Sequence, residues 1–319
     1  MSEMALEVVE YHSNDFEWET LKQEVEGNPS YQFHAFSTHA DNPEPQLQVC
    51  CGRPEQENFS NANSTAWESF HHRHSSGKFF KERRYLLNEF PELASCDNVS
   101  SSILEVGCGS GSSVIPILRG NKSVVVYACD CSAEILCKLK EFVNNASIDG
   151  VQNRFHSFQC DFVSSGFPSW LKTNCGLVTC RDTQEERCMP ESHCCTKGVN
   201  FVSLIFTLSA VPFNRMQDAV KECYSVLKPG GLLLFRDYGL YDMSMLRFEA
   251  HKKVGFREYM RSDGTRSYFF CLDTVRNLFS GAGFIEVELQ FCCVNSANRR
   301  KGLSMKRVWV HGKFRRPTI

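Results

Sequence analysis

The sequence predicts an α/β protein with a mainly parallel sheet, and three observations carry that prediction. Short apolar runs alternate with helical segments between residues 102 and 281, as in strands joined by right-handed helical crossovers. The first run leads directly into glycines at 107, 109 and 111. The second and third runs end in Asp130 and Asp161. Because ligands of such sheets bind at the carboxyl ends of the strands, these residues mark the expected site.

The order of the expected elements follows from the period of the apolar residues. The expected strands are 102–106, 123–129, 154–160, 199–206, 232–235, 284–293 and 305–314. The expected helices are 112–119, 132–145, 214–227 and 272–281. Asp263-Gly264 predicts a hairpin turn. We expect residues 236–270, which contain this hairpin, to face a substrate over the ligand cleft.

Composition limits the class of protein. The 319 residues are 42% hydrophobic and allow one large domain or two small ones. Residues 1–65 carry a net charge of −10 and the remaining chain +8, so the segment 1–65 is expected to be a flexible acidic leader. A basic body fits a polyanion such as RNA, although a solvated surface without a partner stays open.

The 17 cysteines show no paired framework, and the amino terminus resembles neither a secretory signal nor a transit peptide. We therefore expect an intracellular protein with reduced thiols, cytoplasmic or also nuclear, with no membrane contact. Cysteines gather with His193 in residues 172–198. Their spacing fits no common zinc site, so a surface insertion without a metal is expected, with zinc as the alternative.

The glycine loop favours one ligand. Its spacing is G-x-G-x-G, unlike the G-x-G-x-x-G of dinucleotide sites, and Glu105 stands two residues before Gly107. A carboxylate there would repel a pyrophosphate but attract the ammonium of S-adenosylmethionine. A nicotinamide cofactor, or a glycine turn without ligand, is the alternative. Asp130 can accept both ribose hydroxyls or cap a helix, and Asp161 can accept from the adenine amino group or form a turn.

Two segments carry many cations. One alternates them with aromatic rings, and the other concentrates them without acidic residues. In residues 66–98 the cations Lys78, Lys81, Arg83 and Arg84 alternate with Phe79, Phe80 and Tyr85. Residues 299–316 hold eight Lys or Arg and no acid, beginning with Arg299, Arg300 and Lys301. Cations bind phosphates and rings stack on bases, so both segments are expected to bind RNA. An amphipathic helix and a solvated basic edge are the alternatives.

Six motifs together resemble one known family. They are Trp67 to Phe70, Phe79 to Arg83, Glu105 to Gly109, Leu204 to Val211, Phe235 to Asp242 and Asp263 to Phe270. The chain from about residue 67 to 317 is similar to the methyltransferase-like proteins that make 3-methylcytidine in tRNA anticodon loops. The resemblance implies a Rossmann-like class I methyltransferase that uses S-adenosylmethionine. It implies a seven-stranded, mostly parallel sheet with a reversed last strand, helices on both faces and an N-terminal helical RNA-binding extension.

The resemblance also assigns residues. Its donor contacts fall on Trp67, His71, Gly107, Asp130, Asp161, Phe162 and Ile205, with Glu105, Gly109 and Gly111 completing the loop. His71 stands where the family usually has Tyr, and Glu82-Arg83-Arg84-Tyr85 replaces its usual Asp-Arg-His-Trp. The expected substrate is tRNA, not DNA, at position 32 of tRNAs for serine, threonine or arginine. Some relatives need a helper, such as a seryl-tRNA synthetase or another RNA-binding protein.

The expected mechanism requires placement and no general base, because N3 of neutral cytosine carries a free lone pair that can attack the methyl group directly. N3 lies on the pairing edge, so the base must be unstacked or in a loop. The residues expected to clamp it are Asp237, Tyr238, Tyr259, Arg261 and Arg266. A methyltransferase of another RNA, a protein or a small molecule, and a non-catalytic RNA-binding adaptor, are the alternatives.

Overall fold

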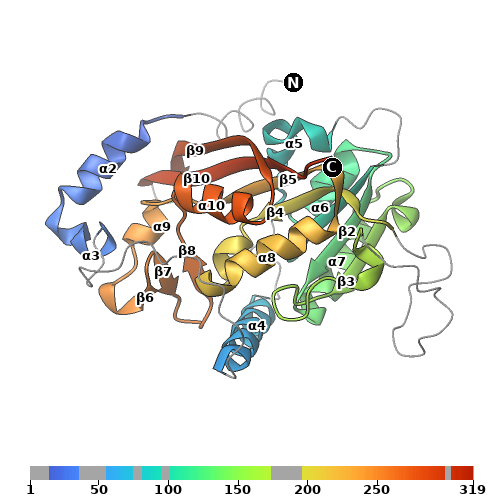
Figure 1. Cartoon of the computed structure of the whole chain (residues 1–319), viewed down its shortest axis with the longest axis horizontal. Helices are drawn as coiled ribbons and strands as arrows, with labels where there is room; N and C mark the ends of the chain where they lie inside the picture. Colours follow the sequence, from blue (N-terminus) through green and yellow to red (C-terminus); the bar gives the residue numbers. More distant parts are fainter. Residues whose placement is uncertain are drawn as a thin grey trace.

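Seven strands form the central sheet, in the order β3-β2-β1-β4-β5-β10-β9 (Figure 1). The computed structural model describes residues 14–35, 55–74, 81–94, 101–173, 196–298 and 303–318. The strands are β1 (Ser102–Val106), β2 (Val125–Asp130), β3 (Phe155–Gln159), β4 (Val199–Ile205), β5 (Leu227–Tyr238), β9 (Ile285–Asn298) and β10 (Leu303–Arg315). The first five pair in parallel, and β10 is antiparallel to β5 and to β9. The predicted parallel sheet with a reversed last strand is confirmed.

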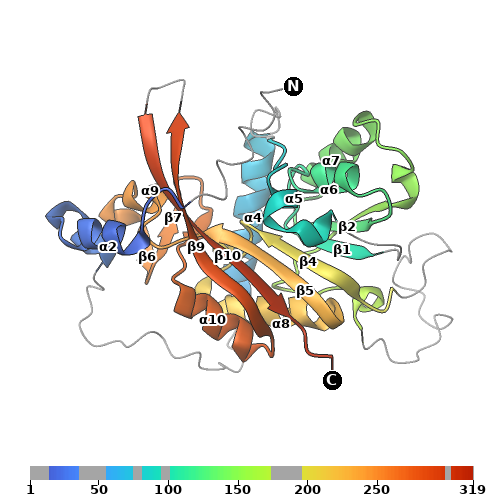
Figure 2. The ribbon, with the colours of Figure 1, turned by 90° about the horizontal axis from the view of Figure 1, so that it is seen from above.

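Helices cover both faces of the sheet (Figure 2). One face carries α5 (Leu86–Glu89), α6 (Val114–Gly120) and α7 (Ala133–Asn145), and the other carries α8 (Phe213–Val226) and α10 (Leu272–Gly281). Successive side chains of β1 point to opposite faces of the sheet. Leu104 packs in the core beneath α8, and Ile103 packs in the core beneath α6. A strand buried on both faces reads as a continuous apolar run.

The segment expected to be flexible is folded where the structure describes it. Helix α2 (Trp18–Glu26), the 3-10 turn η1 (Pro29–Tyr31) and α3 (Gln32–Ala35) pack beside β9 and α9. The Trp18 ring stacks 4.6 Å from that of Phe291, and its Nε1 donates to the carbonyl of Leu240 at 3.2 Å. Loose attachment is therefore the wrong expectation for residues 14–35, because their apolar side chains are buried by residues far along the chain.

The boundary expected between residues 65 and 66 falls inside one helix, α4 (Glu55–Arg73). The turn of α5 follows it and leads into η2 (Pro91–Leu93). The extension predicted over residues 66–98 thus has a helical character, but its first helix begins within the acidic segment. No described helix is long and apolar enough to cross a membrane.

A second, three-stranded sheet follows β5 and contains the predicted hairpin. It consists of β6 (Lys253–Gly255), β7 (Glu258–Met260) and β8 (Arg266–Tyr268), joined to β5 through α9 (Met243–Leu246) and η6 (Ala250–Lys252). Gly264 forms the turn with φ +86°, a conformation that favours glycine. The remaining 3-10 turns are η3 (Val151–Asn153), η4 (Ser169–Leu171) and η5 (Leu208–Ala210).

Three predicted features lie outside the described residues. They are Lys78, the cysteines and His193 of the 172–198 segment, and the cations Arg299, Arg300 and Lys301. In the part of the chain that the structure describes, no three His, Cys, Asp or Glu side chains gather as metal ligands would.

A buried ion pair fastens α5 to the sheet. Arg236 of β5 is fully buried, and its Nη1 lies 2.5 Å from Oε2 of Glu89 in α5. The Arg236 guanidinium lies over the ring of Trp309 on β10, 4.5 Å from its centroid. His311 shares the Glu89 carboxylate at 2.9 Å. Burial alone would raise the pKa of Glu89, but Arg236 and His311 outweigh it and hold that pKa below its usual value.

We expect Glu89→Gln to lower the free energy of unfolding by about 3–5 kcal/mol, because it leaves the buried Arg236 without its counter-charge. Urea unfolding followed by tryptophan fluorescence measures this loss. The matched control is Asp273→Asn, which breaks an exposed pair with Arg276 and should change stability by less than about 1 kcal/mol. Equal, small effects of both substitutions would contradict the assigned role of the buried pair.

Candidate active site

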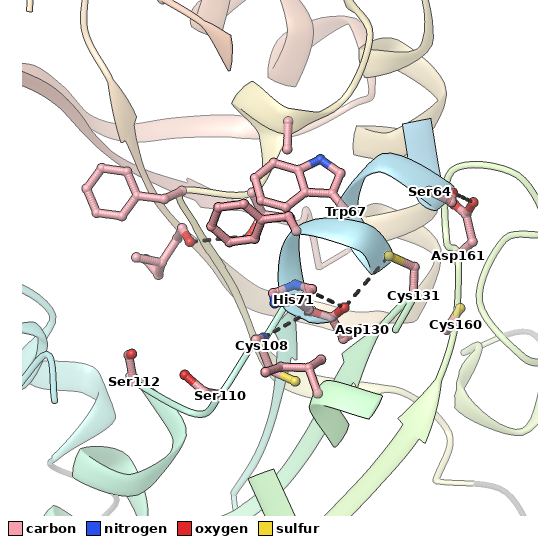
Figure 3. Close-up of a pocket in the computed structure, with 18 of the residues that line it drawn as sticks. Ser64, Trp67, His71, Cys108, Ser110, Ser112, Asp130, Cys131, Cys160 and Asp161 are labelled. Carbon is pink, nitrogen blue, oxygen red and sulfur yellow. Dashed lines mark hydrogen bonds and ion pairs between the residues drawn. The ribbon is translucent and has the colours of Figure 1, made fainter. Parts of the chain in front are cut away.

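A cavity of about 280 Å³ opens at the carboxyl ends of the first four strands, beneath α4 (Figure 3). Its wall contains many of the residues predicted to bind a methyl donor: Trp67, His71, Gly107, Gly109, Asp130, Asp161, Phe162 and Ile205. They come from five separate stretches of the chain. The folded structure therefore brings the predicted donor residues together, and each individual contact with the donor stays a prediction.

The glycine loop lets the backbone form one wall of this cavity. A Cβ on Gly107 would lie 2.6 Å from a side-chain carbon of Thr207, so the ends of β1 and β4 approach each other only because that atom is absent. Gly109 has φ +51°, and a Cβ there would meet nothing within 4 Å, so this glycine faces the open cavity. Gly111 instead lies against Leu139 of α7 and is not part of the wall.

Asp130 organises the loop from the end of β2. Its Oδ2 accepts a hydrogen bond from the backbone N–H of Gly109 at 3.0 Å, and its Oδ1 accepts from that of Ser132 at 3.0 Å. The helix cap proposed as an alternative belongs to Ser132, whose hydroxyl accepts from the Ile135 N–H of α7. The Asp130 carboxylate thus lies in the wall of the cavity (Figure 3), where a ribose could meet it.

Helix α4 closes the cavity over Asp130 and Asp161. His71 Nε2 lies 3.9 Å from the Asp130 carboxylate, and the Ser64 hydroxyl donates to Asp161 (Figure 3). Burial lowers the pKa of His71 below its usual value, although Asp130 and Glu134 oppose the shift, so the ring is neutral at pH 7. Asp161 also accepts from the backbone N–H groups of residues 163 and 164 at 3.2 Å, which is the turn role considered for it.

Glu105 lies behind the glycine loop rather than in the wall. The side chain is fully buried, and its Oε2 finds no hydrogen-bond partner among the described residues. Burial raises the pKa of Glu105 to about 7, while Ser203, Arg83 and Ser113 oppose part of the rise. A buried acceptor without a partner, directly behind the glycine loop, fits a ligand that carries an ammonium group.

Arg83 was expected on an RNA-binding surface, and the structure places it in the cavity instead. Its guanidinium lies 5.3 Å from the centroid of the Phe206 ring, and its Nη1 donates to the Ser113 hydroxyl at 3.2 Å. Its neighbours Lys81 and Arg84 are exposed. The alternation of charge and ring around residue 83 gave no sign of this difference, because all three cations share one short stretch.

The residues expected to clamp the base are not in the cavity wall. Asp237 is fully buried and accepts from the Ser209 N–H at 2.9 Å, and burial raises its pKa to about 6. Tyr238 lies beside the Phe206 ring, with centroids 5.1 Å apart. Tyr238 thus lies next to Phe206, which belongs to the cavity wall and to the motif Leu204 to Val211 but is not among the predicted site residues.

The other three clamp candidates hold the hairpin itself. Arg261 donates to the carbonyl of Arg266 at 3.4 Å, and Arg266 Nη1 pairs with Glu258 at 2.9 Å. Tyr259 points away from the cavity, since its buried hydroxyl bonds to His34 of α3 at 2.8 Å. Among the described residues that line the cavity, none belongs to the hairpin. A role for Tyr259 at the base is therefore not supported by this geometry.

Three thiols also line the cavity, those of Cys108, Cys131 and Cys160 (Figure 3). Burial raises the pKa of each, that of Cys160 to about 12, and nearby carboxylates add to the shift. All three are therefore protonated at pH 7, and none is a thiolate that could attack a substrate.

Comparison with known proteins identifies the class. A family model described as a methyltransferase domain matches residues 70–289. A solved S-adenosylmethionine-dependent methyltransferase from Anabaena variabilis shares the fold, with a TM-score of 0.53 and 11% identity over 79% of this chain and 94% of that chain. The sheet with its reversed last strand and the glycine-lined cavity thus define a class I methyltransferase with S-adenosylmethionine as its methyl donor.

Closer relatives narrow the family. Human tRNA N(3)-cytidine methyltransferase METTL6 is 37% identical over 254 residues, which cover 79% of each chain. The mouse METTL6 protein is 35% identical over 90% of this chain and 92% of its own. Drosophila melanogaster tRNA N(3)-methylcytidine methyltransferase Mettl2 is 34% identical over 82% and 74%. The chain belongs to this family of methyltransferases.

We expect Asp130→Ala to weaken donor binding at least about 100-fold, because it removes a charge-assisted acceptor and the bond that holds Gly109. Calorimetric titration with S-adenosylhomocysteine measures the affinity, and thermal unfolding shows whether the variant is folded. The control is Asp149→Ala, an exposed aspartate at the loop before η3. A folded Asp130 variant with unchanged affinity would remove the ribose assignment.

The raised pKa of Glu105 predicts that the stability of the protein depends on pH. Because burial raises its folded-state pKa from 4.5 to about 7, the stability it contributes is fully present below pH 4.5 and is lost as the pH rises through 7. The ligand-free Glu105→Gln protein should therefore lose less stability than wild type between pH 5 and 8.

The same substitution should weaken donor binding about tenfold at pH 8, because the donor ammonium loses its counter-charge. Chemical unfolding across pH and calorimetry with S-adenosylhomocysteine test the two effects separately. A flatter stability profile with unchanged affinity would assign Glu105 to the fold alone.

Proposed function

We propose that this protein transfers a methyl group from S-adenosylmethionine to N3 of a cytidine in tRNA, at position 32 of the anticodon loop of tRNAs for serine, threonine or arginine. The observation that carries the proposal is the donor cavity, in which a glycine loop, Asp130 and Asp161 meet beneath α4. The relatives named as tRNA N(3)-cytidine methyltransferases support the choice of substrate.

The reaction requires the protein to hold the donor and the cytosine so that N3, the methyl carbon and the sulfur lie in line. S-adenosylmethionine supplies an electrophilic methyl group on a sulfonium. The N3 lone pair of cytosine forms the new bond to carbon, and the sulfur keeps the electrons of the bond that breaks. Asp130 and the glycine loop would hold the donor. Asp237 and Tyr238 do not line the cavity and would position the segment around Phe206 rather than touch the base. Holding the reacting atoms about 3–3.5 Å apart is enough for catalysis of this kind.

Lysine and arginine side chains of the chain would hold the tRNA backbone. Lys81 and Arg84 are exposed on the segment that follows α4. Strands β9 and β10 extend beyond the rest of the sheet as a two-stranded arm (Figure 2), and Lys78, Arg299, Arg300 and Lys301 complete the proposed phosphate contacts from outside the described residues. We propose that a seryl-tRNA synthetase or another RNA-binding protein acts as a helper. We propose a cytoplasmic location, which cell fractionation tests.

Purified protein, labelled donor and unmodified tRNA transcripts test the activity. We expect 3-methylcytidine after nuclease digestion and mass spectrometry, a primer-extension stop at position 32, and no product with Asp130→Ala. Reactions with and without seryl-tRNA synthetase show whether a helper raises the rate. Label recovered in protein instead of RNA would favour a protein methyltransferase, and donor binding without any transfer would favour a non-catalytic adaptor.

A further inference from the structure

Phe206 stands out by its backbone. It directly follows the last residue of β4 and has φ +56°, a left-handed conformation that is a genuine outlier for a bulky side chain. Such strain persists only where the surrounding structure imposes it, and it gathers at functional sites.

Hydrogen bonds on both sides impose the strained conformation. The Phe206 N–H donates to the carbonyl of Arg236 on β5 at 2.7 Å. The next residue, Thr207, donates through its hydroxyl to the carbonyl of Val106 at 2.9 Å and also packs against Gly107. The chain is thus tied to β5 on one side and to β1 on the other. Between these ties, the side chain of Phe206 forms part of the cavity wall.

The ring lies where the donor side meets the side expected for the base. Thr207 connects it to the glycine loop, while Tyr238 lies 5.1 Å away between centroids at an interplanar angle of 48°. The Arg83 guanidinium lies 5.3 Å from the same ring centroid, and its charge lowers the pKa values of Glu105 and Asp237, opposing part of the rise that burial causes. Phe206 is only partly buried, so part of its surface is available to a ligand.

The reaction moves a positive charge onto the base. The sulfonium becomes a neutral thioether as its bond to the methyl carbon breaks, and the pyrimidine becomes a cation as N3 forms the new bond. The face of an aromatic ring attracts a cation and stacks on a base. A ring beside N3 would therefore bind the charged product-like pyrimidine more tightly than neutral cytosine, which is what lowers a barrier.

We propose that Phe206 is the surface on which the target cytosine stacks, and that its ring favours the cationic pyrimidine formed by methyl transfer. This inference rests on the proposed function. It makes Phe206 a residue that contacts the substrate, whereas Arg236 and Thr207 position it through the backbone and do not touch the base.

Substitutions at Phe206 test the inference through kinetics. We expect Phe206→Leu to lower kcat at least tenfold while the affinity for S-adenosylhomocysteine stays within twofold, and Phe206→Tyr, which keeps the ring, to stay within threefold of wild type. Phe206→Gly relieves the strain and should remain folded but lose activity as Phe206→Leu does. The control is Phe155→Leu, which removes a half-buried ring at the opposite end of β3 and should leave kcat unchanged.

A binding measurement separates stacking from a purely structural role. Anticodon stem-loop RNAs carrying cytidine or 3-methylcytidine at position 32 are titrated in the presence of S-adenosylhomocysteine. Wild type should bind the methylated, cationic form several-fold more tightly, and Phe206→Leu should lose that preference. Full activity and an unchanged preference in Phe206→Leu would overturn the inference. Failure of the wild type to form 3-methylcytidine would instead overturn the proposed function.

Discussion

The site depends on one fully buried arginine. The side chain of Arg236 pairs with Glu89 and so fixes the helix that follows Arg83, while its backbone carbonyl accepts from Phe206. A charge so deep in the protein is tolerated only because a carboxylate and aromatic faces surround it. The same residue therefore helps to position a cation, Arg83, and the aromatic ring of Phe206, which meet in the cavity wall although they are distant in sequence.

Helix α4 contacts two parts of the structure that lie far apart in the sequence, helix α7 and the hairpin turn. Its His72 pairs with Glu134 of α7 at 3.0 Å, and its Arg73 donates to the carbonyl of Asp263 in the hairpin turn at 3.4 Å. In the preceding turns of the same helix, Trp67 and His71 line the cavity. The aromatic residues of this helix thus form one wall of the cavity, while the cations Lys81 and Arg84 that follow it are exposed.

Local chemistry made much of the site predictable. The strand, glycine turn and helix around residues 103–119 are specified by neighbouring residues, as is Asp130 at the end of the next strand. The directions of Arg83, Tyr259 and Phe206 are set by partners far along the chain, namely Ser113, His34 and Arg236. The docking of α2 likewise requires Phe291. Apolar periodicity shows that such residues are buried but does not show against what.

The three cysteines around the cavity bear on whether the enzyme methylates itself. Sulfur is a strong nucleophile, and a sulfonium methyl group held next to an ionised cysteine would alkylate the enzyme itself. The surroundings of Cys108, Cys131 and Cys160 keep these side chains in their poorly nucleophilic S–H form. S-adenosylmethionine can therefore bind close to these thiols without methylating them. The incoming nucleobase is then the better acceptor of the methyl group.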